Sequence, residues 1–307
     1  MMPAYSESGR HMRPTLLLML TVPPLLWGSN AVLGQLAAGS IAPVLLNVLR
    51  WSVALALLAP FALRQIGPHL PALRAQWKFL LLSGFLGITC YNALQYLALT
   101  TSSALNISLI GAATPVFILI SGRVFFGQRI NVLSAIGALV SVVGVACVLA
   151  RGDVSRLNTI SFVPGDLFML VAAFAWGLYT LLLKQPRARV PITVLLSVQI
   201  AIGLLCSLPL AAAEHMWGGY APLVWGWREI AIVMYVGTMP SLVAYFCWQR
   251  AVSQTSAQLP VFFMNLTPLF TVSLAALMLN EHPQAFHYIG LALILGGIYL
   301  AHRSQPA

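Results

Sequence analysis

Aromatic and amide side chains recur in this sequence at spacings of three and four residues, which place them on one face of a helix. Tyr91 and Gln95 form one such pair, and Trp27 and Asn30 form another. Rings can stack on a flat or apolar ligand, and amides can hydrogen-bond its polar end. We therefore predict a binding site for a small molecule. The candidate residues are Trp27, Asn30, Tyr91, Gln95, Trp176, Tyr179, Tyr245, Trp248 and Asn265.

The same amides could instead hold helices together. Without a partner, an amide that faces hydrocarbon costs about 4–8 kcal/mol, so Asn30, Gln95 and Asn265 are expected to face the protein interior. There, a hydrogen bond between helices contributes about 0.6–2 kcal/mol, and this structural role stays open for each single residue. For the set as a whole, matching stripes in both halves of the chain favour a cavity.

Arg50 is a basic residue within an apolar segment, where its charge must be paired or hydrated. In one interpretation, its guanidinium binds a substrate carboxylate. In the other, it binds helix carbonyls or extends toward the membrane surface. Both interpretations stay open.

Acidic residues are few, and none lies near the middle of an apolar segment. Proton relays through a bilayer normally use an intramembrane acid or histidine, so we expect facilitated transport without one. Asp166 follows Pro164-Gly165 and is expected to cap a helix N-terminus. The six acidic residues are Glu7, Asp153, Asp166, Glu214, Glu229 and Glu281.

Other functional classes find little support. The six histidines map to tails, loops or segment ends, and no His-Glu-x-x-His or Gly-x-Ser-x-Gly motif occurs. We therefore predict no catalytic residue, no metal site and no cofactor, with an intramembrane enzyme, a channel or a receptor as alternatives to a transporter. The net charge of +10 is dispersed between apolar runs, which argues against nucleic-acid binding.

The elements that carry these residues are predicted to be transmembrane helices. Sixty per cent of the 307 residues are hydrophobic and 7% are charged, whereas soluble proteins carry about 25% charged residues. Each crossing needs about 20 apolar residues. The ten predicted crossings are residues 14–34, 42–63, 77–99, 103–123, 130–150, 165–184, 191–213, 229–250, 256–279 and 285–302.

Loop charges predict the orientation, because Lys and Arg accumulate on the cytoplasmic side. With the N-terminus inside, twelve of the sixteen basic residues lie inside and three outside, with Arg50 within a span. Both termini are therefore predicted to be cytoplasmic.

The two halves of the chain resemble one another. Trp27-Gly28 recurs as Trp176-Gly177 after 149 residues, and Thr114-Pro115 recurs as Thr267-Pro268 after 153 residues. Five crossings in each copy force the second copy to insert from the opposite side, which predicts two inverted five-helix repeats around a midplane site. Pro115 and Pro268 are expected to bend their helices at equivalent heights, either as hinges or as static kinks.

These features divide the chain into four parts. We predict a disordered cytoplasmic tail over residues 1–13, a first repeat over 14–150, a periplasmic linker over 151–164 and a second repeat over 165–303.

The chain resembles the EamA family of the drug/metabolite transporter superfamily. The resemblance rests on Trp-Gly in the first and sixth segments, Arg50 in the second, Thr-Pro in the fourth and ninth, and Asn280-Glu281 after the ninth. At the place of Glu281 the first half carries Gln128, so a role of this acid would be one-sided.

The family resemblance implies an all-α membrane protein that transports small molecules by alternating access, in a bacterial inner membrane, as a monomer or weak homodimer. Within the family the chain is similar to bacterial exporters of aromatic amino acids. An exporter or facilitator of small amphipathic metabolites, such as aromatic or other neutral amino acids, is therefore expected, with organic cations or nucleosides as alternative substrates. The lipid bilayer and the substrate are the expected partners.

Overall fold

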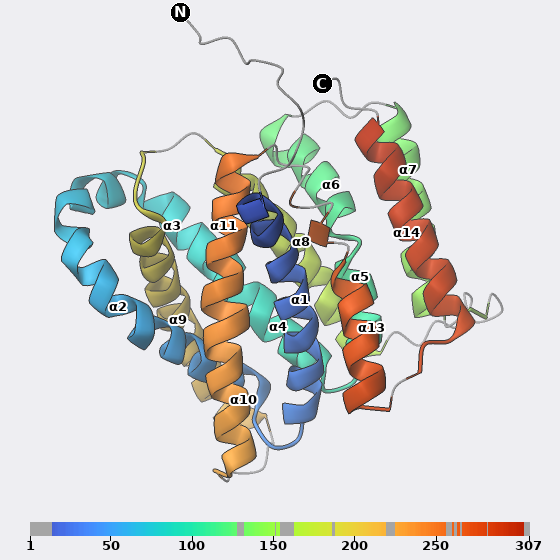
Figure 1. Cartoon of the computed structure of the whole chain (residues 1–307), viewed down its shortest axis with the longest axis horizontal. Helices are drawn as coiled ribbons and strands as arrows, with labels where there is room; N and C mark the ends of the chain where they lie inside the picture. Colours follow the sequence, from blue (N-terminus) through green and yellow to red (C-terminus); the bar gives the residue numbers. More distant parts are fainter. Residues whose placement is uncertain are drawn as a thin grey trace, which may run out of the picture.

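The fold is all helical over the part of the chain that the computed structural model describes (Figure 1). That part comprises residues 14–127, 132–150, 152–153, 163–185, 188–218, 225–255, 260, 263–264, 266–280 and 282–303. The predicted tail and most of the predicted linker lie outside it. The first half contains α1 (Pro14–Ala37), α2 (Pro43–Ala75), α3 (Trp77–Gly84), η1 (Phe85–Cys90), α4 (Tyr91–Ala98), α5 (Ala104–Gly111), α6 (Thr114–Phe126) and α7 (Val132–Leu149). The second half contains α8 (Pro164–Lys184), α9 (Ile192–Trp217), α10 (Trp227–Thr238), η3 (Met239–Val243), α11 (Ala244–Gln254), α13 (Thr267–Met278) and α14 (Ala285–Arg303).

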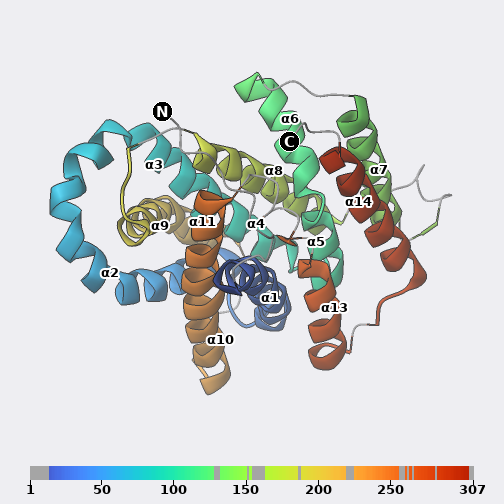
Figure 2. The same ribbon diagram turned by 45° about the horizontal axis from the view of Figure 1, so that its top comes forward.

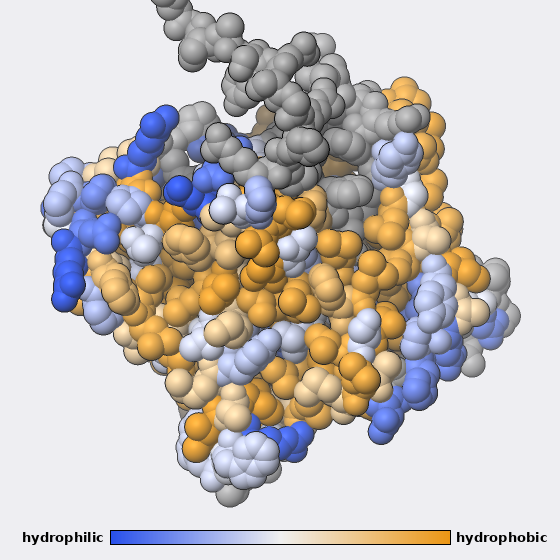
Figure 3. Space-filling model, in the orientation of Figure 1, coloured by the Kyte–Doolittle hydropathy of each residue, from blue (hydrophilic) through white to orange (hydrophobic). Residues whose placement is uncertain are grey.

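Seven helical stretches of the described chain are long and apolar enough to cross a membrane, and three shorter apolar helices accompany them. Large hydrophobic side chains lie exposed along them, such as Leu63, Leu139 and Leu277. Figure 3 shows hydrophobic residues covering most of one face over α1, α11 and α13. Exposed apolar surface of this extent suits lipid rather than water. The chain is therefore an all-α membrane protein, while the count of ten crossings stays a prediction.

Two local features differ from the sequence-based expectation. The second crossing was predicted to end at residue 63, but α2 continues to Ala75 because the polar segment beyond the apolar run keeps its helical backbone bonds. Asp166 does not cap α8, whose N-cap is Val163. It lies in the first helical turn, where a negative charge interacts favourably with the helix dipole, and it accepts a hydrogen bond from Ser102.

The repeat is visible in where the helices begin. Helices α2 and α9 start 149 residues apart, and the pairs α4 and α11, α6 and α13, and α7 and α14 start 153 residues apart. The π-helical turns η1 and η3 interrupt the third crossing of each half at corresponding places. The two halves therefore share one architecture.

Helices α7 and α14 lie side by side and antiparallel (Figures 1 and 2). A methyl group on Gly144 would come within 2.8 Å of the Gly290 carbonyl oxygen, and one on Gly297 would collide with the Gly137 carbonyl. Small residues thus let the two backbones touch. Gly137 corresponds to Gly290, and Gly144 to Gly297, so each contact is the copy of the other under a two-fold rotation. This symmetry is that of inverted repeats.

For the description of the interface we divide the remaining helices into two groups, each of which mixes both repeats. Group I comprises α1, α2, α10, η3, α11 and α13, and group II comprises α3, η1, α4, α5, α6, α8 and α9. The two groups are in contact along their length, most extensively between α2 and α9. We call the end where α1 finishes and α2 starts the outer end, following the predicted orientation, and the opposite end the inner end.

The fourth and ninth predicted crossings break where their prolines occur. Helix α5 ends at Gly111, and Pro115 is the second residue of α6. Pro268 is likewise the second residue of α13. Proline suits the first turn of a helix because its missing N–H has no helical partner there. A hinge role for Pro115 and Pro268 stays a prediction.

Candidate substrate-binding site

Four predicted aromatic residues meet at the centre of the molecule. The Trp27 ring from α1 lies 5.2 Å from Trp176 of α8 and 5.4 Å from Trp248 of α11, centroid to centroid. Tyr245 lies 5.6 Å from Trp176. Several of these pairs meet edge to face, a favoured arrangement for aromatic rings. Each ring is at most 6% exposed, so the rings form part of the core.

Three more rings complete this arrangement. Tyr91 lies 4.8 Å and Tyr179 5.0 Å from Trp176. Trp51, which the sequence did not single out, lies 4.9 Å from Tyr245. We call the seven residues the ring cluster: Trp27, Trp51, Tyr91, Trp176, Tyr179, Tyr245 and Trp248.

Arg50 lies beside the ring cluster, completely buried. Its Nη1 donates to Asn92 Oδ1 at 3.0 Å, to the Tyr96 hydroxyl at 2.9 Å and to Asn30 Oδ1 at 3.3 Å. Its Nε donates to Ser241 Oγ at 2.8 Å. These bonds connect α1, α2, α4 and η3, so Arg50 has a structural role in the described conformation.

The Arg50 charge has no carboxylate partner among the described residues. Its Nη2 makes no hydrogen bond within them. The guanidinium carbon lies 5.1 Å from the centroid of the Trp51 ring and 5.6 Å from that of Tyr96, at cation–π distance. Rings and neutral oxygens thus stabilise the cation, and its field makes this region of the protein attractive to an anion.

A line of hydrogen bonds runs from Arg50 to a small cavity. Asn30 accepts from Arg50 and donates from Nδ2 to Gln95 Oε1 at 3.5 Å. Gln95 lines the cavity together with Tyr91 and Trp27. Since its Oε1 accepts from Asn30, the Gln95 Nε2 is the amide donor that has no partner among the described residues.

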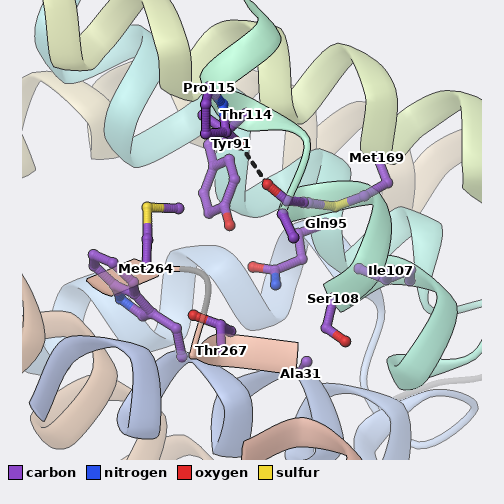
Figure 4. A pocket seen from close by; sticks show the side chains of 13 residues that line it. Ala31, Tyr91, Gln95, Ile107, Ser108, Thr114, Pro115, Met169, Met264 and Thr267 are labelled. Carbon is purple, nitrogen blue, oxygen red and sulfur yellow. Dashed lines mark hydrogen bonds between the residues drawn. The ribbon is translucent and has the colours of Figure 1, made fainter. Parts of the chain in front are cut away.

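The cavity lies between α1, α4, α5, α8 and α13 (Figure 4). Tyr91, Gln95, Met264 and Thr267 surround the same space in this view. Its volume is about 20 Å³, enough for about one water molecule. An amino acid does not fit, so the described conformation is a closed one in which the rings pack on one another.

The two π-helical turns supply backbone acceptors to these side chains. Asn92 Nδ2 donates to the Gly87 carbonyl at 2.8 Å, and the Tyr245 hydroxyl donates to the same oxygen at 2.6 Å. Trp27 Nε1 donates to the Pro240 carbonyl at 3.3 Å. Such turns frequently mark functional sites. The sequence analysis did not predict either turn. Pro240 within η3 was a visible sign of an irregular helix there, and η1 has no such residue.

A second polar cluster, also missed except for Tyr179, lies in the inner half. Gln249 Nε2 donates to the Tyr179 hydroxyl at 3.1 Å and to Gln199 Oε1 at 2.8 Å. Gln199 Nε2 donates to Ser83 Oγ at 2.9 Å. All four side chains are at most 5% exposed.

Three indole N–H groups at the centre have no hydrogen-bond partner within the described chain: those of Trp51, Trp176 and Trp248. A buried donor without a partner costs about 1–3 kcal/mol. The centre of the protein is therefore rich in donors. The structure brings together every predicted site residue except Asn265, which lies outside the described residues.

The model of the EamA-like transporter family matches residues 14–150 and again residues 163–303. The chain belongs to this family. This EamA protein is 27% identical over 289 residues to an uncharacterised transporter of Archaeoglobus fulgidus, and the match covers 94% of this chain and 97% of that protein. It is 25% identical over 280 residues to the aromatic amino acid exporter YddG of Ancylobacter novellus, covering 90% and 93% of the two chains.

A solved crystal structure shares the fold. It superimposes with a TM-score of 0.63 at 22% identity, covering 94% of this chain and 98% of the other. The EamA membership identifies the chain as a multi-pass membrane transporter and not an enzyme, as the sequence predicted.

Proposed function

We propose that this EamA protein carries small amphipathic molecules with a ring and a carboxylate, such as aromatic amino acids, across the membrane by alternating access. One observation carries the proposal: a buried ring cluster that borders a small cavity and that holds, together with Arg50, several donors without a partner among the described residues. The rings offer a stacking surface, and the donors require acceptors. An aromatic amino acid supplies both.

The donors favour an acceptor-bearing substrate over a cation. The Gln95 amide faces the cavity, and the Arg50 charge lies behind it through Asn30. Rotation of the rings on opening would bring the indoles of Trp176 and Trp248 within reach of a carboxylate. The positive charge of Arg50 would repel an organic cation, and only the faces of the rings would attract it.

The amino-acid assignment also draws support from the name of the Ancylobacter novellus relative, an aromatic amino acid exporter. Nucleosides, which also combine a ring with acceptors, are the second candidate.

We further propose that the carrier lies in a bacterial inner membrane with both termini cytoplasmic, as a monomer or weak homodimer, and binds no nucleic acid. No carboxylate faces the ring cluster in the described chain, so we propose facilitated exchange rather than proton-coupled transport. Arg50 acts through Asn30 and Gln95 as a positioning residue.

The proposal is tested by counterflow in proteoliposomes loaded with amino acids, nucleosides or organic cations. Exchange of aromatic amino acids without an imposed proton gradient is the expected result. Exchange of organic cations alone, or strict dependence on a proton gradient, would contradict it. A steady ionic current would indicate a channel, and binding without exchange would indicate a receptor.

A further inference from the structure

The polar clusters of the outer and inner halves consist of corresponding residues of the two repeats. Residues of the first two crossings correspond to residues 149 positions later, as the starts of α2 and α9 do. Residues of the third crossing correspond to residues 153 positions later, as the starts of α4 and α11 do. The corresponding pairs are Asn30 and Tyr179, Arg50 and Gln199, and Tyr96 and Gln249.

The hydrogen bonds correspond as well. In the outer cluster, the Tyr96 hydroxyl donates to Asn30 Oδ1 at 2.7 Å and accepts from Arg50 Nη1 at 2.9 Å. In the inner cluster, Gln249 bonds both Tyr179 and Gln199. Tyr96 and Gln249 thus each bridge the two corresponding partners, although Tyr96 donates one bond and accepts the other and Gln249 donates both.

Both sets of bonds cross from one helix group to the other. Asn30 and Arg50 belong to group I, whereas Tyr96 belongs to group II. In the inner cluster the membership is reversed, because Gln249 belongs to group I and its partners to group II. Between the two clusters, Asn92 of group II donates to the Tyr245 hydroxyl of group I at 3.0 Å. These two residues also correspond, so the symmetry axis passes near this bond.

The correspondence extends to the two ends of the interface. Gln35 at the outer end accepts a hydrogen bond from the Ala104 N–H of group II. Its counterpart Lys184 at the inner end donates to the Val252 carbonyl at 2.7 Å and to the Thr255 carbonyl at 2.9 Å. Val252 lies in α11 of group I, and Thr255 follows α11 directly.

We propose that Tyr179, Gln199 and Gln249 form an inner gate, and that Asn30, Arg50 and Tyr96 form the corresponding outer gate. This inference rests on the proposed alternating access. The cavity is closed on both sides because both sets of bonds are formed. Each gate opens when its own bonds break and the groups separate at that end.

Each end of the interface has one cation. Arg50 brings it to the outer gate, where the inner gate has neutral Gln199 at the corresponding place. At the inner end Lys184 supplies it, where the outer end has neutral Gln35. Hydrogen bonds from ionised donors are about twice as strong as neutral ones, so charge-assisted bonds hold both ends closed.

Hydrogen–deuterium exchange of the full chain in lipid nanodiscs, without substrate, tests the gates. Tyr179→Phe removes the Tyr179–Gln249 bond, and Tyr96→Phe removes the two bonds of the Tyr96 hydroxyl, while each keeps the ring. The Arg50–Asn92 and Asn30–Gln95 bonds remain in Tyr96→Phe. For Tyr179→Phe we expect about three- to thirtyfold faster exchange at the inner ends of α8 and α11, and none of this change at the outer ends of α1 and α4. For Tyr96→Phe we expect the opposite sidedness. Gln249→Met removes both inner bonds and should therefore accelerate exchange at the inner ends more than Tyr179→Phe does.

Thr180→Val is the matched control. Thr180 is buried like Tyr179 and adjacent to it, but its hydroxyl donates to the Trp176 carbonyl within the same helix. It should leave both ends unchanged. Equal acceleration at both ends in the gate variants, or no acceleration, would overturn the inference. Sidedness without any counterflow would retain the gates and refute the proposed transport alone.

Discussion

Replacing Gln95 by leucine tests how the carrier holds the carboxylate of its substrate. The Gln95 amide is the polar group through which the Arg50 charge reaches the cavity. A hydrogen bond to a charged group contributes about 1.5–3 kcal/mol, which corresponds to about 10- to 150-fold in affinity. The dissociation constant of phenylalanine should rise by about this factor. Phenethylamine, which has the ring and the ammonium but no carboxylate, should bind with unchanged affinity.

The assay is equilibrium binding of both compounds to the purified carrier, with counterflow as a second readout. Loss of Gln95 also leaves Asn30 Nδ2 without its acceptor, so the free energy of unfolding should fall by about 1–3 kcal/mol. Thermal unfolding must therefore be measured alongside. Ser108→Ala is the control, because Ser108 lines the cavity but its hydroxyl bonds the Leu105 carbonyl in its own helix. If Gln95→Leu weakened the binding of both compounds equally, the amide would have no part in recognising the carboxylate.

Three further predictions concern the rings, the helix contacts and the orientation. Trp176→Ala should reduce the free energy of unfolding by about 3–5 kcal/mol and slow the exchange of ring-bearing substrates. Trp176→Phe should restore most of the stability and most of the exchange rate. Unchanged counterflow in a folded Trp176→Ala variant would show that this ring is not part of the site. Gly297→Val should cost about 1–3 kcal/mol because the added carbons meet the backbone of α7, and thermal unfolding that stays at the wild-type temperature would refute this close contact. Reporter fusions after Arg74 and Arg189 should be cytoplasmic and one near Ser155 periplasmic; the reverse pattern would invert the orientation.

Helical spacing pointed to six of the seven members of the ring cluster, all but Trp51. Tyr91 and Gln95 are one turn apart, and so are Tyr245 and Trp248, and a membrane helix must turn amides and indoles away from lipid. Their meeting in space follows from the repeat, because Trp27 and Trp176 occupy corresponding places. Spacing also predicted most helix boundaries to within a few residues.

What spacing could not predict is the closed conformation. Whether the rings line an open cavity or pack against each other depends on a few hydrogen bonds between helix groups, and such a balance leaves no mark on the sequence. Gln199 was missed because no polar residue lies one turn away from it on its helix, whereas Gln249 was missed although Tyr245 and Ser253 lie one turn away on either side. The η1 turn carries no proline and has no recognisable residue preference.

The paired glycines of α7 and α14 have a consequence for how such a chain could arise. Gly144 meets Gly290 and Gly297 meets Gly137, so the contact is self-complementary, as in an isologous dimer. A half-length ancestor that inserted in both directions would have possessed this whole surface before any gene fusion. Residues 14–150 and 163–303, produced as two separate chains, should therefore still find one another in the membrane.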